Sequence, residues 1–328
     1  MARVALGAAL AFCVAVVAGI ASAQSPPAAP LVGFLPLGSE TSAYDRSLVE
    51  AFRQGLRESG IVEHRDVELE VVWTASELDV APAVLKLMQR GAKLFIPVGT
   101  TASMAVKRQA PQVPILFISV GNPLGIGLVE SLSRPGGTVT GFADSLAEIG
   151  GKYVQFAMAL GKPQSPLHYL WHWDWSDGYY RLQKTEEAVR SVGVKLRAHS
   201  IKELSEVDEA MSAMRKAGAT VVIVQPSPFT FRERERLVAS AMSHGLATIF
   251  AFRDSVRVGA LLAYGPDYAD LNRRAAAYLA RILRGTKPGD LAVEQPTKFE
   301  LLINLRTAKT VNLTVPRSLL LQANQVLE

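Results

Sequence analysis

Apolar and polar positions follow two different periods along this chain. Short continuous apolar runs, such as residues 31–35 and 94–98, are typical of strands buried inside a sheet. Between such runs, apolar side chains recur every three or four positions, as Leu48, Phe52 and Leu56 do, and this spacing predicts a helix with one buried face. The two kinds of segment alternate, which indicates repeated β-α units.

The predicted elements form two blocks of similar length. In the first block the strands are 31–35, 67–73, 94–98, 115–118 and 138–141, and the helices are 45–59, 77–90, 101–110 and about 124–132. In the second block the strands are 167–171, 194–199, 220–224 and 247–250, and the helices are 179–192, 203–217 and 231–243. Each block predicts one α/β domain with a mostly parallel sheet, and such sheets bind ligands outside the carboxyl ends of their strands.

The last part of the chain departs from this two-block order. A strand at 261–264 is followed by a helix that opens at Asp267 and ends at Gly285. One explanation is that the chain recrosses between the domains, which would create a hinge. We therefore predict an α/β fold of two Rossmann-like lobes: an N-terminal lobe of residues 24–142 and about 251–288, and a C-terminal lobe of residues 143–250 and about 289–328.

The first residues have the pattern of a cleaved export signal. Arg3 supplies a short basic start, residues 4–20 are uncharged and rich in Ala, Val and Leu, and Ala21-Ser22-Ala23 has the small-residue pattern of a cleavage site. We therefore predict that residues 1–23 are a signal peptide and that the mature protein is periplasmic. An uncleaved membrane anchor is the alternative, although the segment is slightly short and rich in Ala and Gly for a stable span.

Composition changes this picture in two ways. The chain has 328 residues, a net charge of +5 and one cysteine, Cys13, which lies inside the predicted signal peptide. The mature chain would then have no cysteine, which excludes thiol nucleophiles, iron–sulfur clusters and cysteine-ligated zinc. The small basic excess is spread out, and the densest run, residues 232–236, alternates Arg with Glu as a solvated helix face does. Nucleic-acid binders concentrate their basic residues, so none is expected as a partner.

Motifs for catalysis are absent from the sequence. There is no phosphate-binding G-x-x-x-x-G-K-[ST] loop and no G-x-S-x-G elbow, and Gly125 and Gly127 lack the third glycine of a dinucleotide fingerprint. His168 and His172 are four residues apart, but they lie in a predicted strand, where a zinc helix cannot form. We expect no catalytic residue, no metal and no cofactor.

Polar segments follow the predicted strands of the first block and are candidates for binding. Hydroxyl side chains at the carboxyl ends of strands, next to the free N–H groups of a helix start, can hold a carboxylate. The alternative is ordinary helix capping, which Ser and Thr also favour. These candidates are Ser39, Thr41 and Ser42 after the first strand, Thr100 and Thr101 after the third, and Asn122 after the fourth.

Aromatic and acidic candidates follow the strands of the second block. Three tryptophans at strand spacing, Trp171, Trp173 and Trp175, suggest that Trp173 and Trp175 stack on an aromatic or sugar-like ligand, with Phe229 on the same rim. The alternative is that Trp171 is core and Trp173 covers the lobe. Asp254 could hold a ligand ammonium, or could form a surface salt bridge with Arg253 or Arg257.

Four collinear motifs carry a resemblance to a known family. They are A-F-R-Q-G-L-R at 51–57, R-P-G-G-T-V-T-G at 134–141, Y-G-P-D at 264–267 and E-Q-P-T-K-F-E-L at 294–301. With them the chain resembles, from Leu31 to Glu328, the exported substrate-binding proteins of ABC transporters, of the type that binds tryptophan or tyrosine. The resemblance implies a type I periplasmic-binding-protein fold whose lobes are joined by crossovers near Gly141, Phe250 and Pro288.

The resemblance also implies a function without catalysis. A small-molecule ligand enters the interlobe cleft, the lobes close by a hinge motion, and the closed monomer docks on an ABC permease in the inner membrane. Two departures from the family pattern affect the cleft: Asn122 stands where Asp is frequent, and residues 173–175 replace an Asn-Pro turn. These departures mean that the resemblance does not identify the solute as tryptophan. We expect a solute of a broader class, amino-acid-like or aromatic. A sensory protein that presents its solute to a chemoreceptor or kinase is the alternative function.

Overall fold

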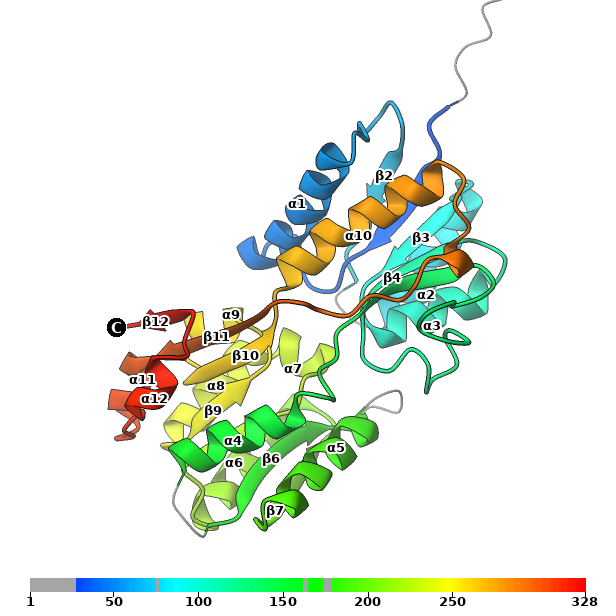
Figure 1. Ribbon diagram of the computed structural model, residues 1–328. Helices are drawn as coiled ribbons and strands as arrows, with labels where there is room; N and C mark the ends of the chain where they lie inside the picture. The colour runs from blue at the N-terminus through cyan, green and yellow to red at the C-terminus, as the bar shows by residue number, and fades with distance from the viewer. Residues whose placement is uncertain (1–27, 75–76, 162–164, 174–177) are drawn as a thin grey trace, which may run out of the picture.

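Two sheets organise the molecule. The computed structural model describes residues 28–74, 77–161, 165–173 and 178–328, and Figure 1 shows one lobe around each sheet. The N-terminal lobe has a five-stranded sheet in the order β2-β1-β3-β4-β5, and the C-terminal lobe a seven-stranded sheet in the order β12-β11-β10-β9-β8-β6-β7. All strand pairs are parallel except β10 with β11, so the predicted two-lobed α/β fold is confirmed.

The first block of sequence builds the N-terminal lobe. Its elements are β1 (Leu31–Leu35), α1 (Ala43–Glu58), β2 (Glu68–Val71), α2 (Glu77–Gln89), β3 (Leu94–Pro97), α3 (Thr100–Gln109), β4 (Ile115–Val120) and β5 (Val139–Ala143). The predicted helix at 124–132 is wrong, because that segment consists of turns. Asn122 accepts a hydrogen bond from the Gly125 N–H at 2.9 Å, and Gly127 has a left-handed φ of 67°, which no helix accommodates.

The second block builds most of the C-terminal lobe. Its elements are α4 (Gly150–Leu160), β6 (Leu167–His172), α5 (Gly178–Ser191), β7 (Leu196–Ile201), η1 (Leu204–Glu206), α6 (Val207–Lys216), β8 (Val221–Val224), α7 (Pro228–Arg232), α8 (Arg234–Ser243), β9 (Ala247–Phe250) and α9 (Asp254–Arg257). Helix α4 has no counterpart among the predicted elements. The predicted helix at 231–243 is divided into α7, which starts earlier at a Pro, and α8.

The end of the chain crosses between the lobes at other positions than the sequence suggested. It contains β10 (Leu262–Pro266), α10 (Tyr268–Leu283), η2 (Pro288–Asp290), β11 (Phe299–Asn304), α11 (Leu305–Thr310), α12 (Arg317–Leu320) and β12 (Gln325–Leu327). We expected all of 251–288 in the N-terminal lobe, but β10 pairs with β9 and β11 in the other sheet. Only then does α10 return to pack beside α1 (Figure 1).

The segment after α10 also differs from the predicted boundary. Residues 289–294, expected in the C-terminal lobe, still run along the N-terminal lobe, where Thr140 donates a hydrogen bond to the Leu291 carbonyl at 2.7 Å and Glu294 pairs with Phe142. From β11 onward the chain belongs to the C-terminal sheet. An apolar run can pair with either sheet, so the strand pattern alone does not assign it to a lobe.

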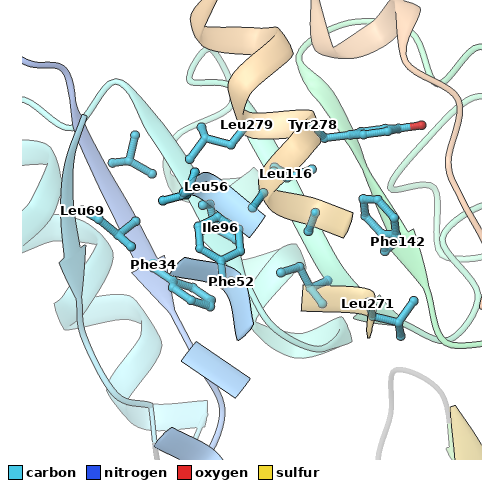
Figure 2. Close-up of a cluster of buried hydrophobic side chains, with 14 of the residues drawn as sticks. Phe34, Phe52, Leu56, Leu69, Ile96, Leu116, Phe142, Leu271, Tyr278 and Leu279 are labelled. Carbon is cyan, nitrogen blue, oxygen red and sulfur yellow. The ribbon is translucent and has the colours of Figure 1, made fainter. Parts of the chain in front are cut away.

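The core of the N-terminal lobe explains why α10 returns. Figure 2 shows side chains from β1, α1 and α10 packed together, with the rings of Phe34 and Phe52 4.9 Å apart and those of Phe142 and Tyr278 5.0 Å apart. Gly55 allows the two helices to meet closely, because a Cβ atom there would lie 2.1 Å from the Arg273 carbonyl oxygen. Helices α2 and α3 cover the opposite face of the sheet.

The described helices are all unsuited to spanning a membrane. None of them combines the length and the apolar character that a bilayer crossing requires. The predicted signal peptide, residues 1–23, lies outside the described residues.

Candidate ligand-binding cleft

Two connected cavities lie between the lobes. The inner chamber has a volume of about 60 Å³ and is lined by Asp144 and Tyr268 at the lobe crossings and by Arg181 from the C-terminal lobe. The outer chamber has a volume of about 470 Å³ and is lined by residues of both lobes, including Phe229. Because Leu37, Val98, Gly99, Thr101 and Pro228 line both, the chambers form one cleft.

The N-terminal lobe contributes the start of α3 to this cleft. Gly99 precedes the helix with a φ of 90°, a left-handed conformation that favours glycine. Thr100 follows β3 closely and accepts a hydrogen bond from the Gly121 N–H at 3.4 Å, while Thr101 lines both chambers. The first turn of α3 has no acidic side chain. The partial positive charge at the N-terminus of this helix therefore faces the cleft and is not neutralised by a carboxylate of the same turn.

A charged pair joins the two lobes inside the inner chamber. Asp144 lies directly after β5, and its carboxylate accepts hydrogen bonds from the Leu146 N–H at 3.0 Å and from the Ser119 hydroxyl at 3.3 Å. Arg181, from the first turn of α5, places one guanidinium nitrogen 3.4 Å from the same carboxylate. Only 3% of the Asp144 side chain and 9% of the Arg181 side chain are exposed.

Backbone strain is concentrated around this carboxylate. Ser119 and Ser145 have positive φ angles of 59° and 53°, an uncommon conformation for residues other than glycine. The register of β4 against β5 shifts between Ile118 and Val120, which places the Ser119 hydroxyl toward Asp144. Strained residues cost of order 1–3 kcal/mol each and tend to occur at functional sites, so this strain supports a role for Asp144.

Aromatic rings from both lobes form the wall of the inner chamber. Phe252 and Tyr268 line it with their rings 5.7 Å apart, and Phe231 of α7 packs against Phe252 at 4.8 Å. Burial raises the pKa of Tyr268 well above its ordinary value, and the nearby Asp144 carboxylate raises it further. Its hydroxyl is therefore neutral, and among the described residues it has no hydrogen-bond partner.

The outer chamber is larger and has a stacked pair of rings on its C-terminal-lobe side. Phe229 and His172 are parallel within 5°, with ring centroids 4.3 Å apart. His172 donates from Nε2 to the Lys202 carbonyl at 3.2 Å, and Arg232 lies 5.7 Å from the Phe229 centroid. A capping box between Ser227 and Thr230 fixes the start of α7, which positions Phe229.

Three of the sequence-predicted residues line the cleft, namely Thr100, Thr101 and Phe229. Ser39, Thr41 and Ser42 are absent from the lining of both chambers. The Ser39 and Thr41 hydroxyls bond each other at 2.8 Å, and Ser42 caps α1 by accepting from the Asp45 N–H at 3.2 Å. Such local contacts agree with the alternative that these hydroxyl side chains serve turns and helix caps and do not bind a ligand.

Asn122, Trp173 and Asp254 are also absent from the described lining of both chambers. Asn122 is used in the local turn with Gly125. Trp173 is 47% exposed and stacks on Trp171 with centroids 6.0 Å apart, while Trp175 lies outside the described residues.

Asp254 forms an ion pair, but with a different partner from those we considered. Its carboxylate accepts from Arg234 at 3.0 and 3.1 Å, instead of from Arg253 or Arg257. Both side chains are about nine-tenths buried, so the pair is internal and not a surface salt bridge. The ligand roles of the residues outside the lining stay predictions.

Sequence reasoning missed the residues that distinguish the inner chamber. Asp144 follows β5 as the predicted candidates follow their strands, so the same rule could have identified it. Arg181 and Tyr268 gave no local signal, because each lies at the start of a helix and reaches the chamber only through the arrangement of the lobes. Among the described residues, no cluster of three His, Cys, Asp or Glu side chains is placed to hold a metal ion.

Comparisons with known proteins identify the family and the fold of the chain. The chain matches the family model of ABC transporter substrate binding proteins over residues 41–327. It is 21% identical over 266 residues to the tyrosine-binding protein of Clostridioides difficile (strain R20291), covering 80% of this chain and 76% of that one.

Two solved structures share the fold over 91% of this chain. The ABC domain in complex with L-Trp from Streptococcus pneumonia has a TM-score of 0.82 and 20% identity, and all of that chain is covered. A conserved domain protein from Vibrio cholerae has a TM-score of 0.79 and 19% identity, with 99% of that chain covered. The chain therefore belongs to the family of ABC transporter substrate binding proteins.

Proposed function

We propose that this chain captures a small organic solute, amino-acid-like or aromatic, in the interlobe cleft and delivers it to an ABC importer. The observation that carries the proposal is the cleft itself, since its connected chambers are lined from both lobes. The outer chamber, at about 470 Å³, has the size of a typical small-molecule site. The proposal places the mature protein outside the cytoplasm, in the periplasm, after removal of residues 1–23.

The walls of the cleft suggest how such a solute is held. The positive start of α3, with Thr100 and Thr101, suits a carboxylate, because helix N-termini bind anions through free N–H groups. The stacked rings of Phe229 and His172 suit an apolar or aromatic body. The names of two relatives, a tyrosine-binding protein and a domain in complex with L-Trp, support an aromatic amino acid.

Closure of the lobes would accompany binding. The chain passes between the lobes after β5, between β10 and α10, and before β11, so three short segments can act together as a hinge. A solute that contacts both walls binds the closed arrangement better than the open one and shifts the population toward it. The closed form is the one we expect the permease to recognise.

A thermal-shift screen tests the proposed binding. Proteinogenic amino acids, aromatic acids and small sugars are added to the mature chain, and the midpoint of unfolding is measured. A solute at 100 times its Kd should stabilise the folded state by about 2.7 kcal/mol. If no amino acid and no aromatic compound raises the midpoint, the solute class proposed here is wrong.

Export and delivery need their own measurements. Mass spectrometry of the protein from the periplasmic fraction should find a mature chain that starts at Gln24. A chain that keeps residues 1–23 in the membrane fraction would instead support the anchor.

Uptake of the identified solute should be lost in cells that lack this protein, and normal uptake would contradict delivery to an importer.

A further inference from the structure

A further cavity, the junction pocket, lies beside the cleft where the two lobes meet. It has a volume of about 230 Å³ and lies between the starts of α1 and α10 and the short helix α9 (Figure 1). Its polar lining consists of Tyr44 and Ser47 of α1, Arg253 and Arg257 at the two ends of α9, and Asp267 before α10. No residue of this lining also lines the inner or the outer chamber, so the junction pocket is separate from the proposed solute site.

Arg257 gives the junction pocket a positive charge that no neighbouring side chain neutralises. The residue is exposed, and it forms no ion pair or hydrogen bond with another described residue. Arg253, in contrast, is balanced, because one of its nitrogens donates to both oxygens of Glu300 at 2.8 and 2.9 Å. The carboxylate of Asp267 accepts from the Asp270 N–H at 3.0 Å and caps α10, whose positive end offsets its charge. The guanidinium of Arg257 is therefore available to an anion.

Two long helices begin at the junction pocket. Helices α1 and α10 have 16 residues each, and their first turns contribute to its lining. The start of a helix carries a partial positive charge and N–H groups without a partner inside the helix. The acids of these first turns are engaged elsewhere, since Asp45 accepts from the Ser39 N–H at 2.9 Å and Asp270 pairs with Lys298 at 2.9 Å. Both helix starts therefore favour a negative charge in the pocket.

A buried hydroxyl of the junction pocket supplies an independent sign of a ligand. Tyr44 lines the pocket, and its hydroxyl oxygen is buried and has no hydrogen-bond partner among the described residues. Burial raises the pKa of Tyr44 above its ordinary value, so the hydroxyl keeps its proton at neutral pH and remains a donor. Buried polar groups are nearly always hydrogen-bonded, and an anion in the pocket would give this donor an acceptor.

We propose that the junction pocket binds a small oxyanion, a phosphate, sulfate or carboxylate group, and that the bound anion strengthens solute binding in the cleft. Arg257 supplies the charge, because guanidinium groups form strong hydrogen bonds with such anions. The Tyr44 hydroxyl and the N–H groups of the helix starts supply further donors. Binding of the anion is independent of the proposed function, whereas its effect on the solute rests on that function.

The position of the junction pocket explains the coupling between the two sites. Tyr44 belongs to the N-terminal lobe, whereas Arg253 and Arg257 follow β9 of the C-terminal sheet. An anion that contacts both sides holds the lobes as they are in this structure, where the rings of Tyr44 and Phe231 lie 6.3 Å apart across the junction. A solute that contacts both walls of the cleft favours the same closed arrangement. Two ligands that favour one arrangement raise each other's affinity.

Titration of simple anions tests the site without any solute. Isothermal titration measures the binding of inorganic phosphate, sulfate and acetate to the purified protein in Tris chloride buffer, with sodium chloride added to keep the ionic strength constant. We expect saturable binding of one anion per chain. Phosphate and sulfate test a tetrahedral oxyanion, and acetate tests a carboxylate. If none of the three anions binds saturably, the proposal is overturned.

Two variants assign the anion to the junction pocket. Arg257→Gln should weaken anion binding about tenfold or more, because it removes a hydrogen bond from a charged group. Tyr44→Phe should weaken it about fivefold and, since the hydroxyl has no partner in the protein, should not lower stability when no anion is present. Arg236→Gln, at an exposed arginine of α8, and Tyr179→Phe, at an exposed tyrosine of α5, are matched controls that should leave anion binding unchanged. Unchanged anion affinity in Arg257→Gln would place the anion elsewhere and overturn the proposal.

Solute titrations with and without the anion test the coupling. L-tryptophan and L-tyrosine are the probes, and the anion is the one of the three that binds most tightly, at a saturating concentration. The anion should raise the affinity of the amino acid that binds by about fivefold or more, as allosteric couplings usually do. Arg257→Gln should remove this increase, and Arg236→Gln should keep it. If the anion binds in the junction pocket and solute affinity stays the same, the coupling is wrong and the anion site stands. If neither amino acid binds, the aromatic amino-acid class and the coupling to it are both overturned, and the anion titration alone decides the site.

Discussion

The two chambers of the cleft differ in almost every physical property. The inner chamber is small, buried and charged, and it is bordered by strained residues at a chain crossing. The outer chamber is several times larger and combines stacked rings with charged side chains such as Lys202 at its rim. Under the proposed function, the inner chamber recognises the charge of the solute, and the outer chamber recognises its size and shape.

The largest expected contrast is in stability. Arg181→Ala leaves the Asp144 carboxylate buried without its opposite charge, and should lower the free energy of unfolding by about 3–5 kcal/mol. Lys202→Ala at the outer rim should change it by about 0.5 kcal/mol or less, because surface substitutions usually do. Urea denaturation of both variants measures the difference. Equal effects would mean that the inner pair contributes no more than a surface charge.

The next contrast concerns affinity for an aromatic solute. Phe229→Ala removes the ring that lines the outer chamber, and should weaken binding by about 1–3 kcal/mol. Trp173→Ala should have little effect, because that exposed ring is absent from the described lining of both chambers. Isothermal titration with L-tryptophan compares the two. A large loss of affinity in Trp173→Ala would instead support the sequence-based prediction that Trp173 stacks on the ligand.

A third measurement separates stability from binding. His168 lies at the end of β6 opposite to His172, and its ring stacks on His199. Burial lowers the pKa of His168 from 6.5 to about 4, helped by the neighbouring His199 and Arg197. The unfolded chain therefore binds more protons between these pH values, so stability should fall as the pH drops from about 6.5 to about 4.

Thermal unfolding across this pH range checks the expectation. His168→Gln should reduce the loss of stability in this window. Because His168 lines neither chamber, solute affinity at neutral pH should stay the same. An unchanged pH dependence in the variant would show that other groups account for the acid sensitivity.

The smallest expected effect sharpens the role of strain in the inner chamber. Ser119→Gly relieves the positive φ of 59° but removes the hydroxyl that holds Asp144. These effects oppose each other, so the free energy of unfolding should change by less than about 1 kcal/mol. Solute affinity should nevertheless fall, because the carboxylate loses its orientation. Ser119→Ala, which keeps the strain and loses the hydroxyl, is the control and should be less stable than Ser119→Gly.

Much of the fold was predictable because its signals are local. The buried run at 31–35 became β1, and the stripe of Leu48, Phe52 and Leu56 became α1. Helix 124–132 was mispredicted because a side-chain hydrogen bond and a left-handed glycine outweigh an apolar pattern. The strand at 261–264 was correct as a strand and misplaced as to lobe, since pairing partners are a long-range property.

The candidate site was predictable only in part. Thr100, Thr101 and Phe229 follow strand ends and do line the cleft. Ser39, Ser42 and Asn122 also follow strand ends. Their side chains are instead engaged in short-range turns and caps.

By itself, the sequence determined the alternation of strands and helices, the two lobes and the motifs of the family. These depend on periodicity and on short segments, which act within a few residues. Only the tertiary structure decided that Asp144 and Arg181 meet, because 37 positions separate them and they belong to different elements. Buried charges are paired by the arrangement of the lobes, and no local pattern encodes that arrangement.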